Sequence, residues 1–196
     1  MNSFVAILAI IIAYFCGTLP IAILIAKSKG VDITTVGSGN PGASNVARAL
    51  GAKYGILVFV GDALKGALPV LALLSHKPIA YACAGAAVLG HVFPITRKFK
   101  GGKGVATGAG SLLPLHPFLI IGAGLTWLLV TKVTKKASIA SIAIVPVLVL
   151  AFVMSGTRMW EIFSLIGIGA LVEIRHASNI KRLLSGTEPP VTGSTV

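Results

Sequence analysis

Long runs of apolar residues, separated by short polar stretches, dominate the pattern of the 196-residue chain. An α-helix needs about 20 mostly apolar residues to cross the hydrocarbon core of a bilayer. Runs that satisfy or approach this length occupy 4–26, 55–74, 79–95, 137–154 and 160–174. The pattern therefore predicts an all-α integral membrane protein.

The stretch 104–131 does not fit a plain span, because it is too long for one helix and short for two. The segment Pro114-Leu115-His116-Pro117 lies in its middle. Proline lacks a backbone N–H and restricts the residue before it, so a helix should break there. We therefore expect two short helices at about 104–113 and 118–131, and seven transmembrane helices in total.

The basic residues favour seven spans over six. With the N-terminus outside, fourteen of the seventeen Lys and Arg residues fall on the inner side, Lys77 and Arg158 fall outside, and Lys65 lies within a span. Six spans would put 132–136 and the C-terminal region on opposite sides and weaken this asymmetry. The positive-inside rule thus predicts a cytoplasmic C-terminus and a multi-pass protein of the cell membrane, the inner one where there are two.

Composition excludes a soluble domain. Hydrophobic residues make up 55% and charged residues 11% of the chain, whereas a soluble domain carries roughly 25% charged residues. The net charge of +12 suggests topology signals, anionic headgroups or an anionic substrate. No zinc-finger spacing or aromatic-basic platform points to nucleic acid. Residues 1–184 are expected to form a single transmembrane domain, and 185–196, rich in Pro, Gly, Ser and Thr, a loose cytoplasmic tail.

A first polar motif, Gly37 to Arg48, combines glycines with Ser and Asn donors. A helix start near Ser44 would point free amide groups outward, and Arg48 would follow one turn later. This combination is typical of a phosphate cradle. It is not a P-loop, because the Gly-Lys-Ser/Thr ending is missing, and a tight interfacial loop is the alternative reading.

A second motif, 90–104, places four cations within seven residues and ends on Gly101-Gly102-Lys103-Gly104. Orientation signals account for most of these cations. The glycines around Lys103 instead suggest phosphate binding by backbone amides and one ammonium group.

A third motif, 173–183, is dense in side-chain donors, and His176 and Asn179 would share one helical face. Within the membrane, Asp62 and Lys65 can pair at i,i+3. We interpret them as a structural pair near the active-site end of their span, with a proton relay as the alternative. The four histidines show no zinc spacing, so no metal is expected.

Taken in order, the three motifs resemble the signature segments of the bacterial acyl-phosphate:glycerol-3-phosphate acyltransferase family. The resemblance covers nearly the whole chain and implies a catalytic transmembrane domain without a cofactor. It implies transfer of a fatty acyl group from acyl phosphate to the 1-hydroxyl of sn-glycerol 3-phosphate, the first step of phospholipid synthesis. The products would be lysophosphatidic acid and phosphate. Membrane lipid and the enzyme that makes acyl phosphate are the further partners it suggests.

The resemblance also implies roles for individual residues. The expected catalytic residues are His176, Asn179, Lys103 and Arg48. The expected substrate-binding residues are Ser38, Gly39, Asn40, Gly42, Ser44, Asn45, His91, Gly102 and Ser141, with the 37–44 loop holding the acyl phosphate.

Acyl phosphate has a good leaving group, so a weak base suffices. Our hypothesis is that the donor's own phosphate takes the hydroxyl proton while His176 and Asn179 orient the acceptor. Lys103 and Arg48 would stabilise developing negative charge. A transporter for a small anion is the competing class, favoured by the broken 104–131 stretch and the intramembrane charges. Against it, the motifs gather at one face, and the chain shows no inverted repeat.

Overall fold

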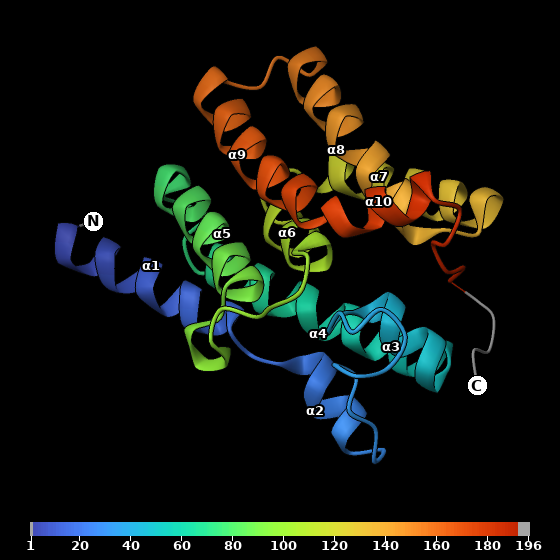
Figure 1. The fold of residues 1–196 in the computed structure, drawn as a ribbon. Helices are drawn as coiled ribbons and strands as arrows, with labels where there is room; N and C mark the ends of the chain where they lie inside the picture. The colour runs from blue at the N-terminus through green and yellow to red at the C-terminus, as the bar shows by residue number, and fades with distance from the viewer. Residues whose placement is uncertain (1, 192–196) are drawn as a thin grey trace.

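The computed structural model describes residues 2–191, and every regular element in that range is helical (Figure 1). The elements, in chain order, are α1 (Ser3–Gly17), α2 (Ile21–Lys27), α3 (Ala43–Leu50), α4 (Ala52–Leu71), α5 (Lys77–Val92), the 3-10 helix η1 (Ile95–Arg97), α6 (Val105–Leu112), α7 (Pro117–Thr134), α8 (Ala137–Met154), α9 (Met159–Arg175) and α10 (Ala177–Leu184).

Five segments are long and apolar enough to cross a bilayer. They are Ser3–Lys27, α4, Lys77–Arg97, α7 and α8. The all-α membrane architecture is therefore confirmed. Helix α9 has 17 residues, whereas α6 has 8 and at 1.5 Å per residue is too short to cross alone. The total of seven spans and their orientation stay predictions.

The first apolar run is not one continuous helix. It breaks after Gly17, and α2 starts at Ile21, directly after Pro20, which cannot donate a helical hydrogen bond. The Thr18 hydroxyl donates to the carbonyl of Phe15 at 2.7 Å. The Lys65 ammonium on α4 donates to the carbonyl of Leu19 at 2.8 Å. The expected span at 4–26 thus corresponds to the candidate span Ser3–Lys27, but its helix is interrupted in the middle, where a buried lysine supports the break.

The helices pack in pairs, α1 beside α5, α4 beside α6, and α7 beside α8 (Figure 1). Glycines allow the closest of these approaches. A side chain at Gly66 would strike the backbone of Thr107 on α6, and one at Gly110 would strike the backbone of Ala63 on α4. By contrast, Phe118 and Val133 on α7 are strongly exposed. Such apolar surface suits contact with lipid, where only helices satisfy their own backbone groups.

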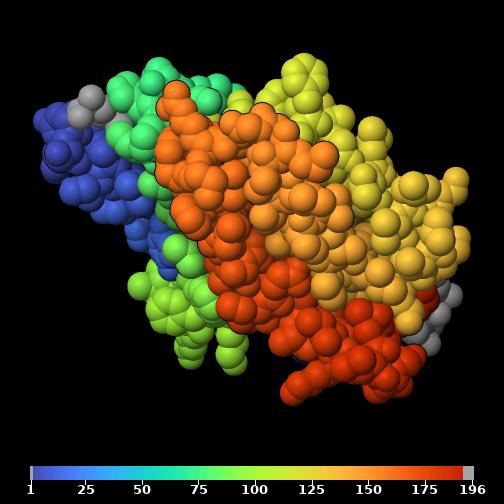
Figure 2. All heavy atoms as spheres, turned by 90° about the horizontal axis from the view of Figure 1, so that it is seen from above, coloured from blue at the N-terminus to red at the C-terminus, as the bar shows by residue number. Residues whose placement is uncertain are grey.

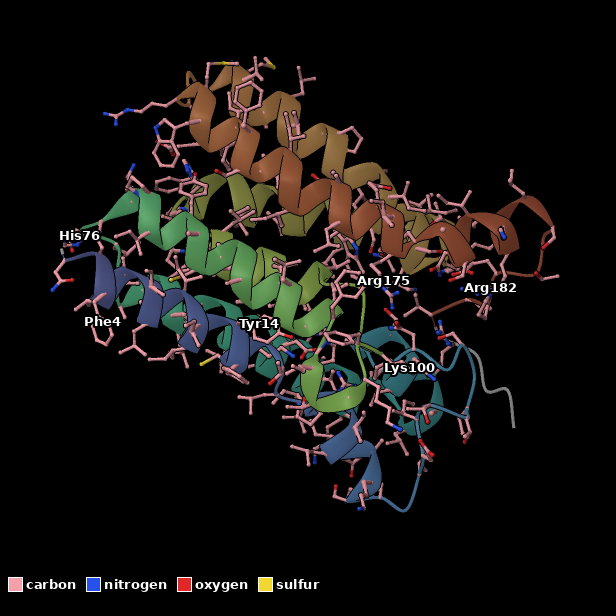
Figure 3. All side chains as sticks on the ribbon, turned by 60° about the vertical axis from the view of Figure 1, so that its left-hand side comes forward. Phe4, Tyr14, His76, Lys100, Arg175 and Arg182 are labelled. Carbon is pink, nitrogen blue, oxygen red and sulfur yellow. The ribbon has the colours of Figure 1, made fainter. Side chains whose placement is uncertain are left out.

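The two ends of the helix bundle differ in chemistry. Lys100, Arg175 and Arg182 lie at one end, and Phe4 and His76 lie at the other (Figure 3). We call the former the basic end. Near the opposite end the Tyr81 hydroxyl lies 2.9 Å from Glu161 Oε2 and 2.6 Å from His116 Nε2.

The C-terminal segment returns to the basic end. The Thr187 amide donates to the carbonyl of Arg182 at 2.8 Å, and the Val191 amide donates to the carbonyl of Lys135 at 2.8 Å. Between them, Glu188 is only 7% exposed. Within the expected loose tail, Thr187 and Val191 thus form backbone hydrogen bonds to the helical part of the chain, while 192–196 lie outside the described residues.

Candidate active site

The loop before α3 is held in shape by one buried side chain, Asn45. Its Nδ2 donates to the carbonyls of Ile33 at 3.2 Å and Val36 at 2.9 Å. Its Oδ1 accepts from the amide of Ser38 at 3.0 Å. A side chain at Gly37, which has φ of +60°, would strike this same amide. The geometry favours Asn45 as a residue that fixes the loop, and direct substrate contact by Asn45 stays a prediction.

The remaining residues of the first motif surround the start of α3. Gly39 has φ of +65°, a conformation that favours glycine. Asn40 and Gly42 lie in contact, and a side chain at Gly42 would meet the Asn40 amide. The helix begins at Ala43, one residue before the expected start, so Ser44 lies in its first turn with the unpaired amides of a helix N-terminus.

Arg48 reaches from α3 across the front of this loop. Its Nη2 donates to Ser38 Oγ and to Asn45 Oδ1, both at 3.4 Å. Its Nη1 donates to the carbonyl of Pro190 at 3.5 Å. The guanidinium therefore joins the first motif to the C-terminal segment.

The Lys103 loop is held from two sides. The Gly102 amide donates to the carbonyl of His91 at 3.1 Å. From the other side, Arg175 Nε donates to the carbonyl of Gly102 at 3.3 Å, and its Nη2 to that of Gly101 at 3.2 Å. Lys103 follows directly, two residues before α6 begins. Arg175 was not expected in the site, because its place in a basic stretch reads as an orientation signal.

His176 lies where α9 ends and α10 begins and is 2% exposed. Its Nδ1 donates to the carbonyl of Val172 at 2.8 Å. In the neutral ring this leaves Nε2 as a hydrogen-bond acceptor. Burial, supported by the nearby cations Lys103 and Arg175 and opposed by the Val172 hydrogen bond, lowers the pKa of His176 to about 4. The ring is therefore neutral at physiological pH.

Glu188 is a second site residue that the sequence did not reveal. Its carboxylate accepts from Asn179 Nδ2 at 2.7 Å and from Arg182 Nε at 2.8 Å. Burial alone would raise the pKa of Glu188, but the polar groups of Ser138, Asn179 and Arg182 outweigh it and the pKa is lowered. In the sequence, the one feature that distinguished Glu188 was its position as a single acidic residue in an otherwise basic region.

The site is rich in positive charge. Burial lowers the pKa of Lys103 to about 8; Arg182, Arg48 and Arg175 lower it too, whereas Glu188 acts in the opposite direction. Desolvation and like charges both disfavour the ammonium form. A site with several cations around one carboxylate retains excess positive charge and is suited to bind an anion.

His91 and Ser141 are both buried. His91 is buried at the end of α5, and a side chain at Gly102 would strike its Nε2. The imidazole therefore supports Gly102 from below. Ser141 Oγ, also buried, accepts from Trp127 Nε1 at 2.9 Å, so its own proton remains available to another acceptor. Direct substrate contact by either residue stays a prediction.

An apolar groove between α8 and α9 leads toward the basic end. The two helices lie side by side, and α10 continues from α9 (Figure 2). The groove has a volume of about 360 Å³ and is lined by Ile142, Val145, Pro146, Val149, Ile166, Ala170 and Glu173. It starts one residue from Ser141 and ends three residues before His176. The groove is thus formed by helix segments that lie next in sequence to two predicted site residues.

Comparison with known proteins agrees with this geometry. The chain matches the family described as glycerol-3-phosphate acyltransferase over residues 7–186. Glycerol-3-phosphate acyltransferases of Aquifex aeolicus and Bacillus subtilis are each 43% identical to it, and the matches cover 93% and 94% of this chain and 97% and 96% of theirs.

Two solved structures share the fold. Both are crystal structures of PlsY, an integral membrane glycerol 3-phosphate acyltransferase, in the glycerol 3-phosphate and lysophosphatidic acid forms. Each is 41% identical in sequence, with TM-scores of 0.91 and 0.88 and coverage of 96% and 95% of both chains. The competing transporter class is thereby set aside. The chain belongs to the glycerol-3-phosphate acyltransferase family and is an integral membrane acyltransferase of phospholipid synthesis.

Proposed function

We propose that the protein transfers a fatty acyl group from acyl phosphate to the 1-hydroxyl of sn-glycerol 3-phosphate. The reaction yields lysophosphatidic acid and inorganic phosphate at the cytoplasmic face of the cell membrane. One observation carries the proposal: Arg48, Lys103 and the neutral His176 gather around one partly buried site at the end of an apolar groove. A charged, phosphate-bearing pair of substrates with one long apolar chain requires this combination.

Each substrate has a matching part of the site. Charge-assisted hydrogen bonds from Arg48 and Lys103 to phosphate are worth roughly 1.5–3 kcal/mol each. The 37–44 loop, shaped by Asn45, offers backbone amides to the phosphate of the donor. The acyl chain lies in the α8–α9 groove and stays in contact with lipid. Acyl phosphate reaches this groove from the enzyme that makes it, which we propose as a partner.

The reaction is an acyl substitution that the donor itself assists. The glycerol oxygen forms a bond to the carbonyl carbon, and the bond from that carbon to the phosphate oxygen breaks. The hydroxyl proton passes to the leaving phosphate. A side chain with a pKa of about 4 is a weak general base at neutral pH. His176 Nε2 instead accepts a hydrogen bond from the hydroxyl and orients it, while Lys103 and Arg48 stabilise negative charge on the carbonyl and phosphate oxygens.

Phosphate release from purified protein in detergent tests the activity. Palmitoyl phosphate and glycerol 3-phosphate together should release phosphate and form lysophosphatidic acid, whereas either substrate alone should not. Glycerol in place of glycerol 3-phosphate, and palmitoyl-coenzyme A in place of palmitoyl phosphate, are the matched controls. Equal product from palmitoyl-coenzyme A would contradict the donor assignment.

The His176→Gln variant tests the proton pathway. Glutamine keeps a hydrogen-bonding group but has no basic nitrogen. We expect binding of glycerol 3-phosphate to weaken while measurable turnover remains at saturating substrate. Normal binding with turnover at the uncatalysed level would instead show that His176 is the base.

A further inference from the structure

A chain of buried polar groups connects the break in the first span to the Lys103 loop. Lys65 Nζ donates to the carbonyl of Leu19 and pairs with Asp62 Oδ1, both at 2.8 Å. Asp62 Oδ1 lies 3.6 Å from Nδ1 of His91, and all three side chains are at least nine-tenths buried. The imidazole then lies directly beneath Gly102. A series of contacts therefore runs from the break after α1 through α4 and α5 to Gly102, the residue before Lys103.

The surroundings disfavour a proton relay through this cluster. The space lined by Leu19, Asp62, Lys65, His91 and Arg97 leaves no room for a water molecule. A relay needs a connected path of water or titratable groups to the site, and here the next element is the backbone of Gly102. The contacts therefore act through packing and shape.

Arg175 adds a second set of contacts to the same loop. Its guanidinium binds the carbonyls of Gly101 and Gly102 and lies over the ring of Phe93, 5.8 Å from its centroid. Arg175 also directly precedes His176 in sequence. The same residue therefore fixes the loop that carries Lys103 and the helix end that carries His176.

We propose that His91 and Arg175 are positioning residues that together hold the Gly101–Lys103 segment in place. The buried Asp62–Lys65 pair fixes the His91 ring. The inference rests on the proposed function in that Lys103 must meet a substrate phosphate. A misplacement on the order of 1 Å in such a group can cost about 100-fold in rate.

Chemical labelling tests the positioning without relying on activity. Acetic anhydride modifies accessible amines, and peptide mass spectrometry compares Lys103 with the exposed Lys53. We expect the Lys103 to Lys53 labelling ratio to rise several-fold in His91→Ala and to stay unchanged in His76→Ala, a matched histidine at the opposite end. An unchanged ratio in a folded His91→Ala protein would overturn the proposal, whatever the enzyme's activity.

A double-mutant cycle tests whether His91 acts through Lys103. We expect His91→Ala to lower kcat/KM by up to about 100-fold, and the double variant His91→Ala/Lys103→Ala to be no less active than Lys103→Ala alone. Independent residues would instead give additive losses, and that result would refute the inference. Where His91→Ala does not fold, the same cycle and labelling use His91→Gln and Arg175→Lys, with the same expected and contrary outcomes.

Discussion

Replacing Lys103 by methionine should stabilise the protein and leave only a small, measurable residual activity. Lys103 is surrounded by Arg48, Arg175 and Arg182, and burial together with these charges lowers its pKa to about 8 from an ordinary 10.5, with Glu188 opposing. The folded state therefore disfavours the charged lysine that the unfolded chain accepts freely. Methionine has a similar length, keeps the packing of the aliphatic stem and removes the charge.

The size of the effect follows from the pKa. A pKa lowered by about 2.5 corresponds to roughly 3.4 kcal/mol at about 1.36 kcal/mol per pH unit. The side chain is partly exposed, so solvent screening reduces this to about 1.5–2 kcal/mol. For a chain of this size, that is a rise of about 3–8 °C in the unfolding temperature.

The assay is thermal unfolding in detergent at pH 7, with Lys100→Met as the control. Lys100 lies in the same loop but is exposed, so its replacement should leave the unfolding temperature unchanged. The gain in stability of Lys103→Met over wild type should have its full value below pH 8. It should shrink as the pH rises from about 8 to 10.5, because the unfolded wild-type chain then binds more protons than the folded one.

Two results would refute this reasoning. A Lys103→Met protein less stable than wild type at pH 7 would show that the ammonium group is paired favourably. A stability difference that does not change between pH 7 and pH 10 would show that its origin is not the charge. Added inorganic phosphate should raise the unfolding temperature of wild type and not that of the variant. This result would link the destabilising charge of Lys103 to anion binding.

Other features give shorter tests. Asn45→Ala breaks four hydrogen bonds worth about 0.5–1.5 kcal/mol each, so thermal unfolding should occur earlier and kcat/KM should fall; unchanged stability would contradict the loop-fixing role. Gly102→Ala should inactivate the enzyme in the phosphate-release assay, whereas Gly122→Ala, in open space on α7, should not. Tyr81→Phe, near the far end, should cost about 1–3 kcal/mol of stability in thermal unfolding without changing KM for glycerol 3-phosphate. Ile166→Trp fills the α8–α9 groove, and kcat/KM should fall more for long-chain than for short-chain acyl phosphates; an equal loss would place the acyl chain elsewhere.

The sequence predicted the helices where hydrophobicity alone decides their limits. The expected 137–154 helix coincides with α8, and the prolines at 114 and 117 end α6 and begin α7 as anticipated. The break near Pro20 was missed because the run was judged by its hydrophobicity, although Gly17, Thr18 and Pro20 interrupt the apolar residues there. Only the distant Lys65, paired with the carbonyl of Leu19, shows that the interruption is stabilised.

The site was predicted best where the chemistry is carried by charge. The structure brings Arg48, Lys103, His176 and Asn179 to one end, as their motifs suggested. The contribution of Glu188 could not be foreseen, because a lone carboxylate in a Pro- and Thr-containing segment has no periodicity that predicts burial. The loop-fixing contacts of Asn45 were also hidden, since its partners lie up to twelve residues upstream.

The buried Lys65–Asp62 pair also bears on how the chain enters the membrane. On insertion scales each charge costs about 2.5–3.5 kcal/mol near the centre of a span, so α4 is a poor candidate to enter lipid by itself. The carbonyl of Leu19, which satisfies Lys65, belongs to the preceding span, whereas His91 arrives only with the next. Helix α4 is thus expected to leave the translocation machinery against the broken first span, and the order of synthesis becomes the order of assembly.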